Sequence, residues 1–377
     1  MNAKEYLKPR LVGERFEGAA IPLEVLRDIA VLEEMIVEVA KWVFKQEHPD
    51  RQRVPRGFTD GIELRLDGIE EGSAIPRIVL ILATTSGCLP GLAENEQCFD
   101  LAKDRLVSAV AAAEDGGDVT DHLPPECLTY FDRVGRSLRS GEHIEFDRAN
   151  QQPPARLTRE SRRKLVLASR VREFTDEIIV RGSIPEADKA DMTFELDIIN
   201  GPKIVGPIPD QHMDVIVEAF VGYQEGKRVM VQGVGRYSRQ NRLTGIDSIE
   251  HITVLDPLDV PARLDEFRPL RRGWLDGVGI PPPQEGLDWL TMQFTASYPE
   301  DAALPYAYPT EDGGILMEWS LGGVEASLDI DLVKRTGFWH LFDTVTDQTD
   351  AREFDLEDPA AWAEIGKMIR ELGGGQG

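Results

Sequence analysis

Residues 314–345 read GILMEWSLGGVEASLDIDLVKRTGFWHLFDTV, and this stretch decides the fold class that the sequence predicts. Apolar and polar side chains alternate along it, which is typical of strands that bury one face. Short turns interrupt the alternation twice. We therefore predict a three-stranded meander with the strands Gly314–Ser320, Val324–Leu332 and Gly337–Val345.

The polar face of this meander is predicted to be acidic. Asp329 and Asp331 lie two residues apart on one strand and therefore share a face, opposite to Leu328 and Ile330. The candidate acidic face comprises Glu318, Glu325, Asp329, Asp331 and Asp343. Clustered carboxylates can hold a divalent cation, but neither a basic residue nor an enclosed site accompanies these, so we predict no metal. Two interpretations stay open: a solvated face, or a docking face for a basic protein partner.

Two helices are predicted to flank the meander, at 286–297 and 360–372, which gives an acidic C-terminal α+β domain at 273–373. Residues 273–377 contain five Lys and Arg against twenty Asp and Glu, whereas residues 156–255 contain fifteen of each. The net charge of −25 is therefore unevenly distributed along the chain. This asymmetry indicates a division of labour between domains.

The centre of the chain, 156–256, is predicted to be a small β-barrel-like domain of the OB or SH3 kind. One amphipathic helix, at about 213–223, interrupts its strands. The strand candidates are Val171–Ser183, Met192–Ile199, Lys203–Val205, Arg228–Tyr237 and Arg242–Leu255. Gly233 and Gly235 lie inside a strand pattern, so we interpret them as a bulge or bend and not as a phosphate-binding loop.

A basic run opens this central region. The possible anion or nucleic-acid contacts are Arg162, Arg163, Lys164, Arg236, Arg239 and Arg242, which could approach one another if the barrel closes. Small barrels often bind single-stranded nucleic acid, but they also need stacking aromatic residues, and these are sparse here. The alternative is that the arginines dock against acidic parts of the same chain or of another protein.

The N-terminal region, 1–150, is predicted to be a further α+β domain. Apolar residues recur with helical spacing from Leu23 to Gln46, after Pro22. Strands at 62–67 and 78–82 are predicted to form a hairpin, with helices at 95–114 and 126–138 and a short strand at 143–147. Segments 150–155 and 257–269 have the composition of linkers.

No residue pattern indicates catalysis. The three cysteines form no C-x-x-C pair, and the six histidines lie at no ligand or catalytic spacing. We therefore predict no catalytic residues, no cofactor and no metal, and the sequence leans against an enzyme. The N-terminus lacks the apolar segment of a signal peptide, and no apolar run is long enough to span a bilayer. We expect a cytoplasmic protein without a membrane partner, of undetermined oligomeric state.

Short stretches resemble uncharacterised bacterial proteins. One resemblance is carried by IPLEVL at 21–26, GIELRL at 61–66 and GSA at 72–74. The other, YPTEDGGILMEW at 308–319, resembles a module of bacterial proteins, some of the toxin–antitoxin or defence-island type. Neither stretch carries catalytic residues of a family.

Three hypotheses about function follow. The first is a non-enzymatic interaction protein, which is antitoxin-like, immunity-like or an adaptor, and which binds a protein partner through the acidic domain. The second is a single-stranded nucleic-acid-binding protein that uses the central barrel. The third is an enzyme with a site that the sequence does not reveal.

Overall fold

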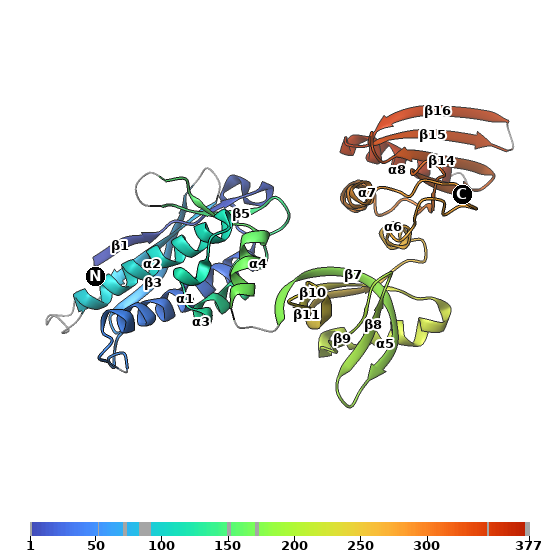
Figure 1. Cartoon of the computed structure of the whole chain (residues 1–377). Coiled ribbons are helices and arrows are strands. Elements are labelled where there is room, and N and C mark those ends of the chain that lie inside the picture. The colour runs from blue at the N-terminus through green and yellow to red at the C-terminus, as the bar shows by residue number, and fades with distance from the viewer. Residues whose placement is uncertain are drawn as a thin grey trace. The chain divides into compact units, whose positions relative to one another are not determined.

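The computed structural model describes residues 2–51, 53–70, 74–82, 92–148, 152–169, 173–344 and 347–373. The protein is of mixed α+β type, as predicted, with 36% helix and 34% strand (Figure 1). Contacts divide the chain into two compact units, Met1–Ile178 with Val234–Asp247, and Ile179–Gly233 with Ser248–Gly377. We refer to these as the first and the second unit. The division into domains at 1–150, 156–256 and 273–373 stays a prediction.

Helix α1 (Leu23–Glu47) is a central packing element of the first unit. Its apolar residues recur with helical spacing and are buried, among them Ile29, Leu32 and Ile36. The helix ends just before Pro49, because a residue that precedes proline disfavours the helical conformation. Helix α2 (Leu92–Asp115) contributes to the same core, so both predicted helices are confirmed.

A three-stranded antiparallel sheet contributes to this core in the order β1-β4-β3. The predicted hairpin is confirmed as β3 (Ile62–Glu70) and β4 (Ile75–Leu82), with Leu64 opposite Leu80. The third strand, β1 (Asn2–Leu7), was not predicted. Its sequence lacks apolar alternation. Its pairing with β4 depends on backbone hydrogen bonds, which the side-chain pattern does not predict.

The predicted helix at 126–138 is wrong. Helix α3 covers only Pro125–Leu128, and the 3-10 turn η3 (Thr129–Asp132) follows it. The carbonyls of Phe131 and Asp132 accept hydrogen bonds from the guanidinium of Arg162, and Gly135 has a φ of +73°. A continuous α-helix to residue 138 would not allow these carbonyl contacts or the positive φ of Gly135, although the composition of the segment suits a helix.

A second small sheet, β2-β5-β6, completes the first unit with helix α4. Its strands are β2 (Arg10–Val12), the predicted β5 (His143–Phe146) and β6 (Ala155–Leu157). The basic run forms α4 (Arg159–Ala168), whose N-cap Thr158 forms a capping box with Ser161. No helix was predicted there, because Arg162 occupies a buried position where an apolar residue would be expected.

Five strands form a closed ring in the order β10-β11-β9-β8-β7, and the boundary between the two units passes through three of them. The strands are β7 (Glu173–Asp188), β8 (Thr193–Ile198), β9 (Lys203–Pro207), β10 (Val229–Ser238) and β11 (Leu243–Val254), with helix α5 (Met213–Val221) after β9. The predicted strands and helix are therefore confirmed. A Cβ added at Gly233 would lie 2.2 Å from the carbonyl oxygen of Ser248, so glycine permits the close approach of β10 and β11.

The C-terminal part of the second unit contains a five-stranded antiparallel meander, so the prediction of three strands is wrong. The predicted strands are present as β13 (Ile315–Leu321), β14 (Val324–Asp331) and β15 (Thr336–Asp343), and the edge strands β12 (Tyr306–Pro309) and β16 (Gln348–Asp355) extend them. Both edge strands lack a continuous apolar alternation, since β12 is short and β16 buries only Phe354.

Three helices accompany the meander: α6 (Val260–Phe267), α7 (Gln284–Ser297) and α8 (Pro359–Gly373). The helices predicted at 286–297 and 360–372 are thus confirmed. Residues of α7 and α8, including Leu290 and Trp362, share one buried core with Met317, Leu328 and Trp339 of the sheet. Because neighbouring strand residues point to opposite faces, the second face of the sheet remains outside this core.

Candidate docking face of the C-terminal sheet

The outer face is the side of the β12–β16 sheet that points away from this core. Cross-strand pairing defines it, since Glu318 lies opposite Ser327, and Asp329 lies opposite Phe338. Its outward strand positions are Tyr306, Tyr308, Leu316, Glu318, Ser320, Glu325, Ser327, Asp329, Asp331, Thr336, Phe338, His340, Phe342, Thr349, Ala351, Glu353 and Asp355. Among these described strand positions there are six carboxylates and neither Lys nor Arg.

Four of the five predicted acidic residues lie on the outer face, and Asp343 does not. Asp343 pairs with Val324 and shares the inner side of β15 with Trp339. Side chains alternate between the two faces along a strand, so Phe342 lies on the outer face and Asp343, the next residue, lies on the inner one. Glu353 and Asp355 were not predicted on this face, because they belong to β16, a strand that was itself not predicted.

Asp329 and Asp331 are in different electrostatic environments. Partial burial, and then the negative charges of Asp312 and Asp331, raise the pKa of Asp329 above its ordinary value. A hydrogen bond of 2.8 Å from the Lys334 ammonium, assisted by backbone N–H groups, lowers the pKa of Asp331. Within the part of the chain that the structure describes, Asp329 has no cationic partner, and an external cation would relieve its repulsion.

A hollow of about 590 Å³ opens beside Asp329 and Asp331. Its lining adds two further carboxylates, Asp312 and Glu353, and the ring of Phe338, which is 53% exposed. Lys334, the cation among the lining residues, is already paired with Asp331. Carboxylates next to an exposed aromatic face suit an organic cation such as a Lys or Arg side chain.

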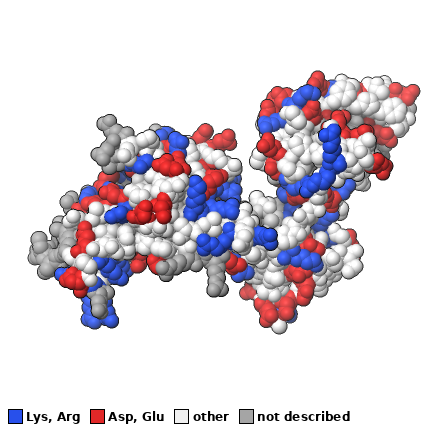
Figure 2. Space-filling view, in the orientation of Figure 1, with Lys and Arg blue, Asp and Glu red and all other residues white. Residues whose placement is uncertain are grey.

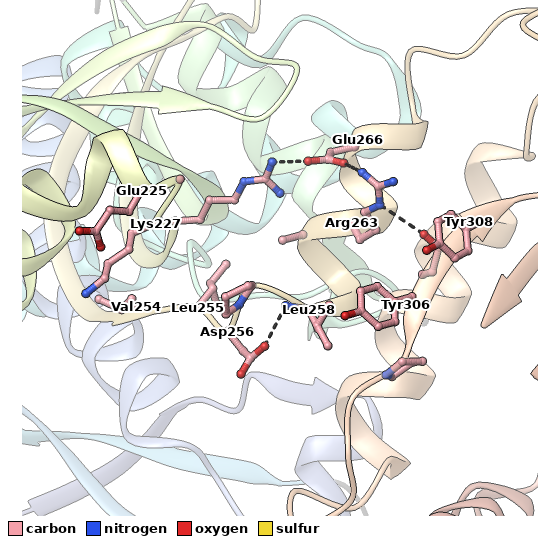
Figure 3. Close-up of a pocket in the computed structure, with 16 residues that line it drawn as sticks. Glu225, Lys227, Val254, Leu255, Asp256, Leu258, Arg263, Glu266, Tyr306 and Tyr308 are labelled. Atoms are coloured by element: carbon pink, nitrogen blue, oxygen red, sulfur yellow. Dashed lines mark hydrogen bonds and ion pairs between the residues drawn. The ribbon is translucent and has the colours of Figure 1, made fainter. Parts of the chain in front are cut away.

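A second cavity, of about 430 Å³, lies at the β12 edge of the sheet (Figure 3). Tyr306 and Tyr308 line it from β12, and a chain of ion pairs lines it from α6 and from the residue just before β10. In this chain both Arg228 and Arg263 pair with Glu266. The cavity therefore combines two exposed phenol rings with charges that are largely neutralised within the protein.

Arg263 also blocks the free edge of β12. Its Nε donates a hydrogen bond of 3.2 Å to the carbonyl of Ala307. Thr310 donates its N–H to Gly314, and hydrogen-bonded positions alternate along antiparallel strands, so the Ala307 carbonyl points away from β13. Pro305 precedes the strand and Pro309 is its last residue, and neither has an N–H to donate. An added strand would find few partners there. Docking on this sheet is thus expected through its face and not through its β12 edge.

The predicted basic contact Arg162 is not on the surface. Only 1% of it is exposed, and its guanidinium donates to the carbonyls of Phe131, Asp132 and Thr175 at 2.6–2.8 Å. Burial lowers the pKa of this guanidinium, while Asp176 and Asp132 oppose that shift. Arg162 therefore binds parts of the first unit together, and we no longer assign it a contact with an external anion.

Most of the other predicted basic residues also contact the first unit itself. Arg163 lies over the ring of Phe174, Lys164 donates to the carbonyl of Ala113, and Arg239 donates to the carbonyl of Leu167. Arg236 and Arg242 are exposed at the end of β10 and the turn that follows it. Lys and Arg side chains gather over α4 in Figure 2. The residues Arg170 and Arg172 lie outside the described residues.

At a hollow of about 360 Å³ in the first unit, carboxylates balance the positive charges of this basic surface. Arg139, Arg159 and Arg163 line it together with Glu142, Glu160 and Asp176. Arg159 pairs with Asp176 at 2.9 Å, and Glu142 pairs with Arg15 at 2.7 Å. Equal numbers of opposite charges leave little excess positive potential for a phosphate backbone.

Among the residues that the structure describes, no group of three or more His, Cys, Asp or Glu side chains is arranged to hold a metal ion. None of the described helices combines the length and the apolar character that a membrane crossing requires. In comparisons with known proteins, the chain matches no family model, no curated protein and no solved structure.

Proposed function

We propose that this protein is a non-enzymatic interaction protein that captures a basic protein partner on the outer face. The observation that carries the proposal is the charge of that face, where six carboxylates and neither Lys nor Arg occupy the described outward strand positions. Complementary charge increases association rates and selects among partners. Such a protein could serve as an antitoxin-like, immunity-like or adaptor component.

The hollow beside Asp329 supports a specific mode of capture. A Lys or Arg side chain of the partner enters it, where the carboxylates of Asp329 and Glu353 accept hydrogen bonds and the ring of Phe338 contacts the cation. Arginine fits better than lysine, because its planar guanidinium can bind a carboxylate and stack on a ring at once. Tyr306 and Tyr308 extend the aromatic surface toward the β12 edge.

The test measures binding of a nona-arginine peptide to the full chain and to the double variant Asp329→Asn, Asp331→Asn. We expect the association rate to fall several-fold and its salt dependence to weaken, as for steering charges. The matched control is Glu285→Gln with Glu300→Gln, which removes the same charge from exposed positions in and just after α7. An equal loss in both double variants would leave only a general effect of net charge.

Binding of single-stranded nucleic acid to the ring is the second candidate. The ring order, with α5 between its third and fourth strands, supports an OB-type barrel. In such barrels the second and third strands contact the ligand, but here β8 presents Glu195 and Asp197, and Lys203 of β9 pairs with both. The charge on this surface therefore makes nucleic acid the weaker proposal.

A single-stranded oligonucleotide titrated against the full chain at low salt tests the second candidate. Electrostatic binding is strongest there and falls steeply as salt is added. We expect Arg236→Ala with Arg242→Ala to weaken any such binding. A flat titration at low salt would remove the nucleic-acid proposal and leave the protein-binding proposal untouched.

A further inference from the structure

Helix α5 presents apolar side chains to solvent. Val217, Phe220 and Val221 are spaced as neighbours on one side of the helix, and Tyr223 follows in the 3-10 turn η6 (Gly222–Glu225). All four are exposed, and Val221 reaches 71%. A surface helix usually directs its polar residues outward. Packing in the core therefore does not explain why these apolar side chains are exposed.

The core does not require these residues. Helix α5 is already anchored by Ile216 and Ala219, both fully buried, on its inner side. The exposed apolar side chains lie next to one another instead of being scattered singly. Contiguous exposed apolar surface with a polar rim is typical of an interaction site.

The rim of this stripe is acidic. Asp214 and Glu218 follow the stripe along the exposed side of α5, and Glu225 follows Tyr223. Lys227 offsets one of these charges, since its ammonium donates to Glu218 at 2.9 Å. Two negative charges remain among these four residues. A partner that matches the stripe therefore needs apolar side chains flanked by Lys or Arg.

We propose that the α5 stripe, formed by Val217, Phe220, Val221 and Tyr223, docks an apolar segment of another protein that carries basic flanking residues. A second copy of this chain fits less well, because it brings the same acidic rim and a net charge of −25. The stripe lies on α5 and η6, and its residues are separate from the sheet that carries the outer face. The inference does not depend on the proposed function of that face.

The test uses a 14-residue synthetic amphipathic helix with a Leu face and Lys flanks. Binding is measured to the full chain in the background Asp329→Asn, Asp331→Asn, so that the outer face attracts the peptide less. We expect Val217→Ser with Val221→Ser to weaken binding at least about tenfold, because two apolar contacts are lost. Both positions are exposed, so the variant is expected to remain folded.

Two controls make the result specific. Met292→Ser removes an apolar side chain that is 66% exposed on α7, and it should leave peptide affinity unchanged. A matched peptide with Glu in place of Lys should bind at least about tenfold more weakly, because it repels the acidic rim. Equal affinity for the two peptides, equal loss in Met292→Ser, or no binding at all would overturn the proposal. A dimer of the parent chain that Val217→Ser with Val221→Ser dissociates would also overturn it, since a second copy would then cover the stripe.

Discussion

The outer face of the C-terminal sheet and the basic surface around α4 both appear as charged regions in the sequence, but their charges are used differently. Around α4, Arg162 is buried against carbonyl groups, and Arg159 is paired with Asp176. On the outer face, Asp329 has no cationic partner among the described residues, and its neighbours Asp312 and Asp331 repel it. Formal charge therefore indicates a binding surface only where the fold leaves that charge uncompensated.

The largest expected effect concerns Arg162, whose charge we describe as compensated within the first unit. We expect Arg162→Met to lower the free energy of unfolding of the first unit by about 3–5 kcal/mol, because buried carbonyls and two nearby carboxylates lose their cation. Urea unfolding followed by circular dichroism measures the change. Arg163→Met, which removes a partly exposed arginine from the next position of α4, is the control and should cost about 1 kcal/mol or less. Equal effects of the two variants would contradict the claim that the buried Arg162 stabilises the first unit more than Arg163 does.

An intermediate effect concerns Asp28, a buried carboxylate of α1. It accepts hydrogen bonds of 2.8 Å from the backbone N–H and the hydroxyl of Ser137. We expect Asp28→Ala to cost about 1–3 kcal/mol, since both donors lose their acceptor. Asp28, unlike Asp329, is a carboxylate whose hydrogen bonds are formed within the protein.

The pH dependence of the Asp28→Ala effect has a definite sign. Burial raises the pKa of Asp28 above its ordinary value, although the bonds from Ser137 oppose the shift. The folded state therefore binds this proton more tightly than the unfolded chain does, and the related stability is lost as the pH rises through the folded pKa. The difference in urea midpoint between the wild type and Asp28→Ala should shrink from about pH 4 to about pH 7. A difference that grows over this range would contradict the cause assigned to the shift.

The smallest expected effects are on stability and compare two carboxylates of the outer face, Asp329 and Asp331. We expect Asp329→Asn to stabilise the protein slightly, by no more than about 0.5 kcal/mol, because it removes repulsion at a largely exposed position. Asp331→Asn should act in the opposite direction, since it weakens the pair with Lys334 that lowers the pKa of Asp331. Thermal unfolding of the two single variants at neutral pH measures both changes. Destabilisation by Asp329→Asn would indicate that this carboxylate has a structural partner.

The candidate site was partly predictable. Glu318, Glu325, Asp329 and Asp331 share the outer face as alternation along the strands predicted. Tyr306 and Tyr308 were missed, although their period of two between prolines was a usable signal. Asp343 was placed on the wrong face, although it lies four residues from the buried Trp339 on β15 and alternation along that one strand puts both side chains on the inner side.

By itself, the sequence determined the elements whose side-chain pattern matches their secondary structure. Helix α1 and strands β13, β14 and β15 bury regularly spaced apolar residues, and burial of that pattern is the main source of their stability. Local periodicity is enough in these cases.

Only the tertiary structure decided the remaining features. Strands β1, β12 and β16 depend on backbone hydrogen bonds to a neighbouring strand, and such bonds leave no periodic signal in the side chains. The burial of Arg162 depends on carbonyl groups about 13 and 30 residues away in sequence. Whether the charge of Arg162 is compensated is set by these long-range contacts, because the energy of a charge depends on the groups that surround it in the fold.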